Sequence, residues 1–328
     1  MLVVVALGGS ALLGSDECLD VEAQRRHVAA AVEAIAPLAA EHQVVVTHGS
    51  APQVGLLALQ NALFRAVAPF PLDVLSAGTE GMVGYLFQQE LANQVRDREI
   101  VSLLTQVVVD PGDPALSAPT KLVGPPMAEV DATRLARDRG WTVTRDGSGF
   151  RRVVPTPEPL AVVELRTIRR LVQAGVVVIC AGGGGIPVDV DASGTVRGVE
   201  AVIDKDRSAA LLATLLDADA LLLLTDVPAV VSDWGSAFAR PLRHVTPDDL
   251  RTLSFEPHSM GPKVAAAARF VERTGKRAAI GAVADATRLL TGEAGTQITP
   301  TQHPDRWYAP SERDTDLLPA SWKASLGG

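Results

Sequence analysis

The feature that most constrains this fold is a set of four short apolar runs, each followed by a loop of glycine or small polar residues. The runs are rich in Val, Leu and Ile and read as strands that are buried on both faces of a sheet. They cover residues 2–7, 44–47, 176–180 and 220–224. Apolar residues at three- and four-residue spacing predict helices at 21–40, 54–67, 160–174, 206–216 and 263–273. This alternation predicts an α/β protein with a mainly parallel sheet.

The loops that follow these runs predict the place of a binding site. They span residues 8–10, 48–51, 182–185 and 225–228. Ligands of open α/β sheets bind beyond the carboxyl ends of the strands. We therefore expect all four loops to border one shared site.

Composition excludes several classes of protein. A net charge of -8 and a pI near 5.3 argue against a nucleic-acid partner or an anionic membrane surface, since either needs a basic face. The apolar runs are too short for a signal peptide or a membrane span, so we expect a cytoplasmic protein. Cys18 and Cys180 lack the spacing of a metal or redox motif, which suits a reducing compartment.

Several well-known motifs are absent from the sequence. The segment 275–277 lacks the upstream glycine and the hydroxyl residue of a Walker A loop, and Pro187 stands where a dinucleotide fingerprint requires glycine. The six histidines show no metal-binding spacing, so we expect no metal site made of protein ligands alone, and no serine elbow is present. What remains is chemistry by positioning and electrostatics.

The lysines are the most informative charged residues. Only five of the 30 basic residues are lysine. Lys205 precedes Asp206 at the predicted start of a helix, and Lys263 follows a Gly-Pro turn at the start of another. Taken singly, each fits an ordinary solvated lysine. Free backbone amides at helix starts favour anions, so the placement of these two lysines predicts phosphate-binding positions.

Two segments depart from the alternating pattern. Residues 110–159 are rich in Pro, Gly and Arg and predict a small protruding hairpin subdomain or lid, or alternatively a long surface loop. After Thr296 the chain is polar and dotted with proline, as in a disordered tail or an arm that packs on a neighbour.

A series of motifs runs in order along nearly the whole chain to about Thr296, at 3–9, 52–56, 71–74, 81–85, 105–110, 119–121, 151–155, 182–187, 198–206, 224–227 and 259–263. Together they resemble the motifs of bacterial carbamate kinases, in the amino acid kinase family. The resemblance implies a three-layer αβα sandwich with an open, mainly parallel sheet and a protruding lid. It also implies a homodimer and reversible phosphoryl transfer between ATP and carbamate, in arginine metabolism, with Mg²⁺ arriving on the nucleotide.

The resemblance further implies a division of the chain. One domain would cover residues 1–296, with an acid-binding half at about 1–175, a lid at about 111–159 and a nucleotide-binding half at about 176–296. Residues 297–328 would form a polar tail.

Roles for single residues also follow from the resemblance. Lys205 and Lys263 would neutralise the transferring phosphoryl group, Asp206 would hold both lysines, and Lys121 would reach in from the lid. The acid would meet Gly9, Ser10, Gly49, Ser50 and Ala51, and the nucleotide would meet Gly8, Gly182, Gly183, Gly184, Asp226 and Met260.

The chain departs from the family pattern on the acid side. Ser10 and Ser50 stand where the family has Asn, Ala51 stands where it has Gly, and Glu80 stands where Gln is usual, so that a charge replaces an amide. Two further hypotheses therefore stay open beside a carbamate kinase. One is a related kinase for another small carboxylate, and the other is a nucleotide-binding sensor with little catalysis.

Overall fold

The computed structural model describes residues 1–9, 20–64, 67–147, 149–234, 236, 239–256 and 259–308. Its central sheet contains β1 (Leu2–Leu7), β2 (Gln43–His48), β3 (Ile100–Ser102), β9 (Val177–Ile179), β12 (Ala220–Thr225), β15 (His244–Val245), β16 (Arg277–Ala282) and β17 (Thr296–Ile298). The strand order is β15-β17-β16-β12-β1-β2-β9-β3, and only the β16–β17 pair is antiparallel. The predicted α/β class with a mainly parallel sheet is confirmed.

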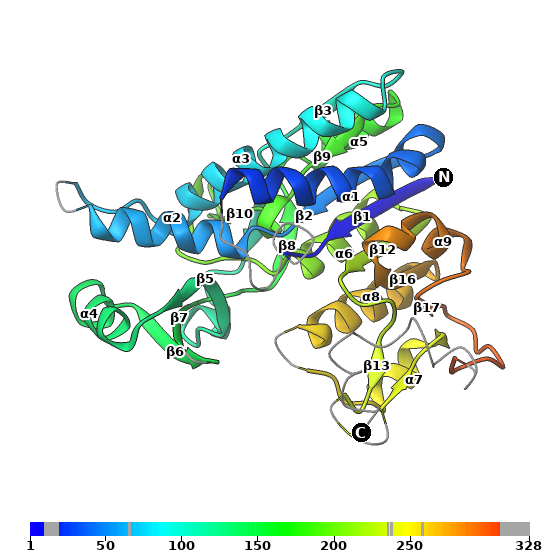
Figure 1. The fold of residues 1–328 in the computed structure, drawn as a ribbon. Helices are drawn as coiled ribbons and strands as arrows, with labels where there is room; N and C mark the ends of the chain where they lie inside the picture. Colours follow the sequence, from blue (N-terminus) through cyan, green and yellow to red (C-terminus); the bar gives the residue numbers. More distant parts are fainter. Residues whose placement is uncertain are drawn as a thin grey trace.

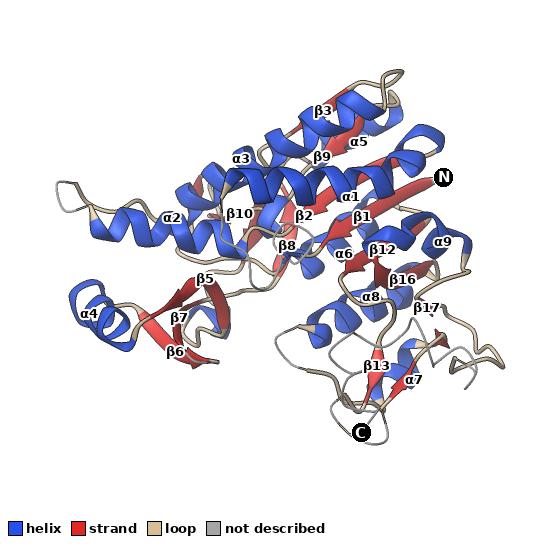
Figure 2. Cartoon of the chain, in the orientation of Figure 1, coloured by secondary structure: helices blue, strands red, loops and turns tan. Residues whose placement is uncertain are grey.

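Helices cover both faces of this sheet (Figures 1 and 2). One face carries α1 (Val21–Glu41), α3 (Leu72–Gln94) and α9 (Ala286–Thr291), and the other carries α5 (Leu165–Gln173), α6 (Lys205–Leu216), α7 (Pro247–Arg251) and α8 (Met260–Thr274). Side chains alternate along β1. Val3 and Val5 therefore pack in the core beneath α1, α3 and α9, whereas Val4 and Ala6 pack in the core beneath α5, α6, α7 and α8. The fold is therefore the expected three-layer αβα sandwich.

The lid is a separate small unit that protrudes from the sandwich (Figure 1). It consists of β5 (Lys121–Met127), α4 (Glu129–Arg139), β6 (Thr142–Asp146) and β7 (Gly149–Val154), with the strand order β5-β7-β6. It is thus a three-stranded sheet with a helix, larger than the hairpin that the sequence suggested. The lid rests on α2 (Ala51–Leu63), against which β5 packs.

Smaller elements complete the chain. A second sheet contains β4 (Gln106–Val109), β8 (Pro159–Val162), β10 (Ile186–Val190) and β11 (Val196–Gly198), and β13 (Val231–Ser232) pairs with β14 (Arg240–Pro241). Short 3-10 helices lie at η2 (Pro114–Leu116), η3 (Gly182–Gly184) and η4 (Val283–Asp285).

The predicted helices differ from the observed ones in several respects. The predicted helix at 160–174 is wrong in its first part, because residues from Pro159 to Val162 form β8 and α5 begins only at Leu165. Helix α2 starts earlier than predicted, with Pro52 in its first turn, and ends at Leu63. Helix α3 was not predicted, since Gly78, Gly81 and Gly84 weaken its helical pattern. No helix among the described residues is long and apolar enough to cross a membrane.

The first part of the predicted tail packs on the body of the same chain. Trp307 bridges to Leu242, the Arg240 guanidinium lies 4.2 Å from the Trp307 ring, and the buried Tyr308 hydroxyl donates to the Gly295 carbonyl at 2.7 Å. Residues 309–328 lie outside the described part of the chain.

Candidate functional site

A cavity of about 380 Å³ lies where the carboxyl ends of β1, β2 and β12 meet the lid and the starts of α6 and α8. The strand register places these ends level, since Leu7 pairs with both His48 and Leu224. The lining residues are Gly8, Gly9, Gly49, Ser50, Ala51, Lys121, Gly183, Asp204, Lys205, Asp206, Thr225, Asp226, Val227, Ser259, Met260, Pro262 and Lys263. All four loops that the sequence singled out thus reach one cavity.

A lysine–aspartate–lysine cluster forms the charged centre of this cavity. The two carboxylate oxygens of Asp206 accept from different lysines: Oδ1 from Lys205 Nζ and Oδ2 from Lys263 Nζ at 3.0 Å. Because Lys205 and Asp206 open α6 while Lys263 lies in the first turn of α8, two helix starts converge here. The cluster places two ammonium groups side by side, as binding of a multiply charged phosphate requires.

Burial tunes the charges of this cluster. Burial lowers the pKa of Lys205 to about 8, with Asp206 opposing the change. Burial alone would raise the pKa of Asp206 and lower that of Lys263. Their mutual attraction, with Lys205 also acting on Asp206, outweighs burial, so the pKa of Asp206 is lowered and that of Lys263 is raised. At neutral pH, Lys263 is therefore the firmly charged lysine of the site, and Lys205 is the one that loses its proton more easily.

The lid contributes a third lysine. Lys121, the first residue of β5, donates from Nζ to Asp204 Oδ2 at 2.8 Å. The other oxygen of Asp204 caps α6 by accepting from the amides of Asp206 and Arg207 at 3.0 and 3.3 Å. Asp204 thus ties the lid to the helix that carries Lys205, and sequence reasoning gave it no role. Its position as helix N-cap was the signal that could have revealed it.

The glycines of the first two loops make a tight wall. A Cβ on Gly49 would lie 2.9 Å from Gly9 N and 3.1 Å from Gly9 Cα, closer than real Cβ atoms normally approach backbone. Gly8 also lines the cavity, although its amide already donates to the Leu224 carbonyl at 3.0 Å. Only glycine at position 49 permits the two strand ends to meet this closely.

The four-glycine run reaches the cavity through Gly183 alone. The Gly182 amide donates to Glu80 Oε1 at 2.9 Å, and the Gly184 amide donates to the Ala181 carbonyl at 3.1 Å. Neither Gly182 nor Gly184 lines the cavity. The expectation that both amides face a phosphate is therefore corrected, because these amides bind within the protein.

The remaining predicted residues fall in the same place, with one exception. Ser50 is the N-cap residue of α2 without a side-chain capping bond, and Ala51 follows it, while Asp226 follows β12 and Met260 begins α8. Ser10 lies outside the described residues.

Glu80, on α3, lies behind the glycine run and is almost fully buried. Its second oxygen accepts from the Thr105 amide at 3.1 Å. Burial raises the pKa of Glu80 to about 8, against the effect of these amides. The expectation that Glu80 adds a charge is therefore corrected: at neutral pH the carboxyl is mainly protonated, and thus neutral like an amide.

His48, at the end of β2, is a further buried group that sequence reasoning left without a role. Burial lowers its pKa to about 4, so the ring is neutral near pH 7. Its Nδ1 lies 3.2 Å from the Gly49 carbonyl, and a Cβ on Gly182 would lie 2.4 Å from its Nε2. His48 and Glu80 together form the floor beneath the glycine run.

The fold and this cavity define the class of protein. The model of the amino acid kinase family matches residues 1–282, and the chain belongs to this family. Carbamate kinase of Haemophilus influenzae is 46% identical over 94% of this chain and 100% of its own, and carbamate kinase of Rhizobium meliloti is 48% identical over 94% and 96%. The structure of carbamate kinase from Giardia lamblia bound to AMP-PNP has a TM-score of 0.83 at 38% identity, covering 91% of this chain and 98% of that one.

Proposed function

We propose that this chain is a carbamate kinase, which transfers the γ-phosphoryl group of ATP to carbamate and runs in both directions. The observation that carries this proposal is the Lys205–Asp206–Lys263 cluster at the charged centre of the shared cavity. The similarity to carbamate kinases over more than nine-tenths of the chain agrees with it.

The transfer needs no general base. A carbamate oxygen, already ionised, attacks the γ-phosphorus and forms the new O–P bond while the bond to the β–γ bridging oxygen breaks, and ADP leaves with that electron pair. The reactants, ATP and carbamate, together carry five negative charges, and so do the products, ADP and carbamoyl phosphate. Phosphoryl transfer depends mainly on alignment and on charge stabilisation. Lys205 and Lys263 supply the charge, and Asp206 holds their ammonium groups at a fixed spacing.

A kinase that uses ATP takes a divalent cation with the nucleotide, and we propose Mg²⁺. Both oxygens of Asp206 and one of Asp204 already accept from lysines, so neither carboxylate is well placed to serve as a ligand. Asp226 is the cavity carboxylate with no lysine pair among the described residues, and it is exposed. Mg²⁺ when bound would neutralise phosphate charge, and Asp226 would be the cavity carboxylate available to hold it.

The two halves of the cavity suggest where each substrate binds. We propose that Gly9, Gly49, Ser50 and Ala51 bind the acid below the lid, and that Asp226 and Met260 border the nucleotide on the other wall. Residues 1–175 and 176–296 would then be the acid-binding and nucleotide-binding halves, with the lid at about 111–159.

We also propose that the chain forms a homodimer. Val74, Met82 and Tyr85 are 46%, 41% and 52% exposed and stand on one face of α3, since eight and three residues separate them. An exposed apolar stripe on a helix is typical of a protein interface.

The cytoplasmic location stays a prediction.

The test of this function is ATP formation from ADP, Mg²⁺ and carbamoyl phosphate by the purified chain. Rapid ATP formation supports the proposal. If that reaction fails but another acyl phosphate reacts, the substrate is a different small carboxylate, which Ser50 and Ala51 on the acid wall make the leading alternative. Tight ATP binding with no acid phosphorylated would leave only the sensor hypothesis.

A further inference from the structure

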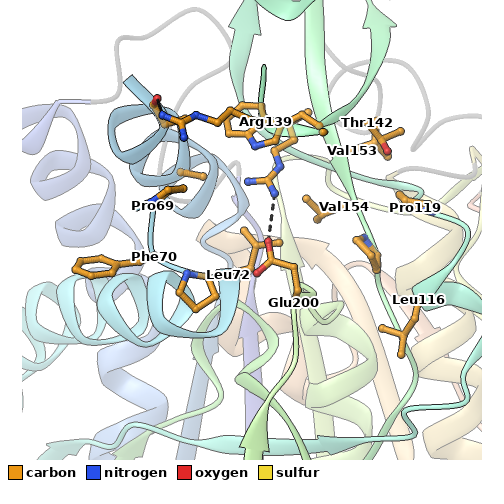
Figure 3. A pocket seen from close by; sticks show the side chains of 17 residues that line it. Pro69, Phe70, Leu72, Leu116, Pro119, Arg139, Thr142, Val153, Val154 and Glu200 are labelled. Carbon is orange, nitrogen blue, oxygen red and sulfur yellow. Dashed lines mark hydrogen bonds and ion pairs between the residues drawn. The ribbon is translucent and has the colours of Figure 1, made fainter. Parts of the chain in front are cut away.

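A second and larger cavity, of about 620 Å³, lies at the junction between the lid and the body and contains none of the three active-site lysines. Figure 3 shows Pro69 and Phe70 from the α2–α3 connection, with Leu72 at the start of α3, on one side and Val153 and Val154 from β7 on the other. Its volume is in the range of small-molecule sites. Its walls belong to two units that are joined by few elements, so a ligand here would touch both.

The positive charge in this cavity is poorly neutralised. Arg152 has a side chain only 14% exposed, and its Nη2 lies 3.4 Å from Glu200 Oε1, longer than an ordinary ion pair. Glu200 cannot close this gap freely, because its Oε2 accepts from the Leu72 amide at 2.7 Å. Figure 3 draws the Arg152–Glu200 contact as a dashed line that ends at the labelled Glu200. Burial lowers the pKa of Arg152, a sign that its charge is costly here.

A second guanidinium stands on the same cavity. Arg139, at the end of α4, donates from Nη2 to the Ala62 carbonyl at 2.7 Å, and among the described residues no carboxylate pairs with it. The Arg152 guanidinium lies 4.2 Å from the centre of the Trp141 ring, which holds it in place. Two arginines therefore line a cavity that contains one carboxylate, Glu200, which of the two contacts only Arg152. Apart from these three groups and Thr142, the lining side chains are Ala, Gly, Pro, Val, Leu, Phe and Trp.

We propose that this cavity binds a small carboxylate with a flat apolar body, whose charge pairs with Arg152 and Arg139. Guanidinium groups bind carboxylates through paired hydrogen bonds, and the apolar walls suit the remainder of such a ligand. A free inorganic anion would leave these walls solvated, and a neutral apolar compound would leave the arginine charge uncompensated.

The same cavity is connected to the candidate active site by the lid sheet. Val154, on the cavity wall, pairs directly with Lys121 in the β5–β7 ladder. A ligand that fixes β7 against the body therefore fixes Lys121 relative to Asp204. This consequence rests on the proposed kinase function: occupancy changes the KM for the acid, whereas ligand binding itself does not depend on that function.

The test uses phenylacetate as the probe and the fluorescence of Trp141, which lines the cavity, as the readout on the full chain. Acetate has the charge without the apolar body, and phenylacetamide has the body without the charge. We expect saturable binding of phenylacetate at millimolar concentration or below, at least tenfold tighter than either comparison compound. The Trp141→Phe variant should lose most of the signal.

Matched variants locate the probe. Arg152→Met and Arg139→Met should each weaken binding at least tenfold, whereas Arg137→Met, on an exposed arginine of the same helix, should not. Lys205→Ala should leave binding unchanged. Circular dichroism establishes which variants fold. If Arg152→Met does not fold, the result for Arg139→Met decides the test.

Three results would overturn the proposal: no saturable signal up to about 10 mM, binding as tight as in the parent protein in both cavity variants, or loss of binding in Lys205→Ala. The last would mean that the probe occupies the active site. A chain that binds phenylacetate but shows no kinase activity would refute the proposed function and leave this site standing.

Discussion

Lys205 is the residue whose charge the proposed chemistry depends on most. Replacing it with Ala removes one of two ammonium groups from the phosphoryl position, and we expect turnover to fall by about 10²–10³-fold with the fold retained. Lys276→Ala is the matched control, since that lysine pairs with Asp217 away from the cavity. Equal turnover in the two variants would contradict the role of Lys205.

The pH dependence of kcat/KM provides a second test of Lys205. Because burial lowers its pKa to about 8, the free enzyme loses this ammonium charge as pH rises through about 8. We therefore expect kcat/KM to fall about tenfold for each further pH unit above that value. A profile that stays flat to pH 10 would show that the charge of Lys205 is not needed.

Glu80 gives a prediction for stability. Its pKa is about 8 in the fold against an ordinary value of 4.5, so between these values the unfolded chain has released a proton that the folded chain keeps. Stability from this group is therefore full below about pH 4.5 and declines until about pH 8, by roughly 5 kcal/mol.

The Glu80→Gln variant tests this decline. Gln resembles the protonated acid at every pH, so the variant should lose less stability than the parent between pH 5 and 8.5. Urea unfolding at both pH values measures the difference. An identical loss in the two proteins would mean that Glu80 is ionised in the fold.

At the scale of elements, the position of the lid depends on one close backbone contact. A Cβ on Gly55 in α2 would lie 2.0 Å from Gly124 N in β5, and Gly124 itself has a φ of +75°. Gly55→Ala must therefore push β5 away from α2. Since β5 begins at Lys121, we expect a higher KM for the acid and at least a tenfold loss of kcat/KM.

The control for this change is Gly78→Ala on α3, where the nearest atom to the added methyl group would be 3.9 Å away. Alanine favours the helix there, so its stability should not fall. If Gly55→Ala keeps full activity with an unchanged KM, the lid does not depend on this contact.

At the scale of the whole molecule, the exposed stripe on α3 predicts a dimer that one charge disrupts. Met82→Asp places a carboxylate in the middle of the stripe, and we expect the particle to change from twice 34.4 kDa to 34.4 kDa in sedimentation equilibrium. Val130→Asp, at an exposed apolar residue of the lid, should remain dimeric. A parent protein that is monomeric at micromolar concentration would contradict the homodimer proposal.

Much of this architecture follows from local pattern. The four apolar runs became β1, β2, β9 and β12, and the glycine loops and lysines at their ends meet in one cavity. Local pattern is sufficient because parallel strands carry their carboxyl ends to a common edge. Helix α3 was not predicted, also for a local reason, since its three glycines weaken the helical pattern of the sequence. The packing of α3 in the fold outweighs this effect.

Local sequence pattern was enough to predict the class of fold, the sheet edge where the candidate site lies, and the lysines that could neutralise phosphate charge. Tertiary structure sets which loop residues face the cavity: the Gly182 amide donates to Glu80, 102 residues away, while Gly183 lines the cavity. It also decided that Glu80 is held as a neutral acid and that Asp204 ties the lid to α6. These outcomes depend on burial and on contacts between residues far apart in the chain, which no local pattern records.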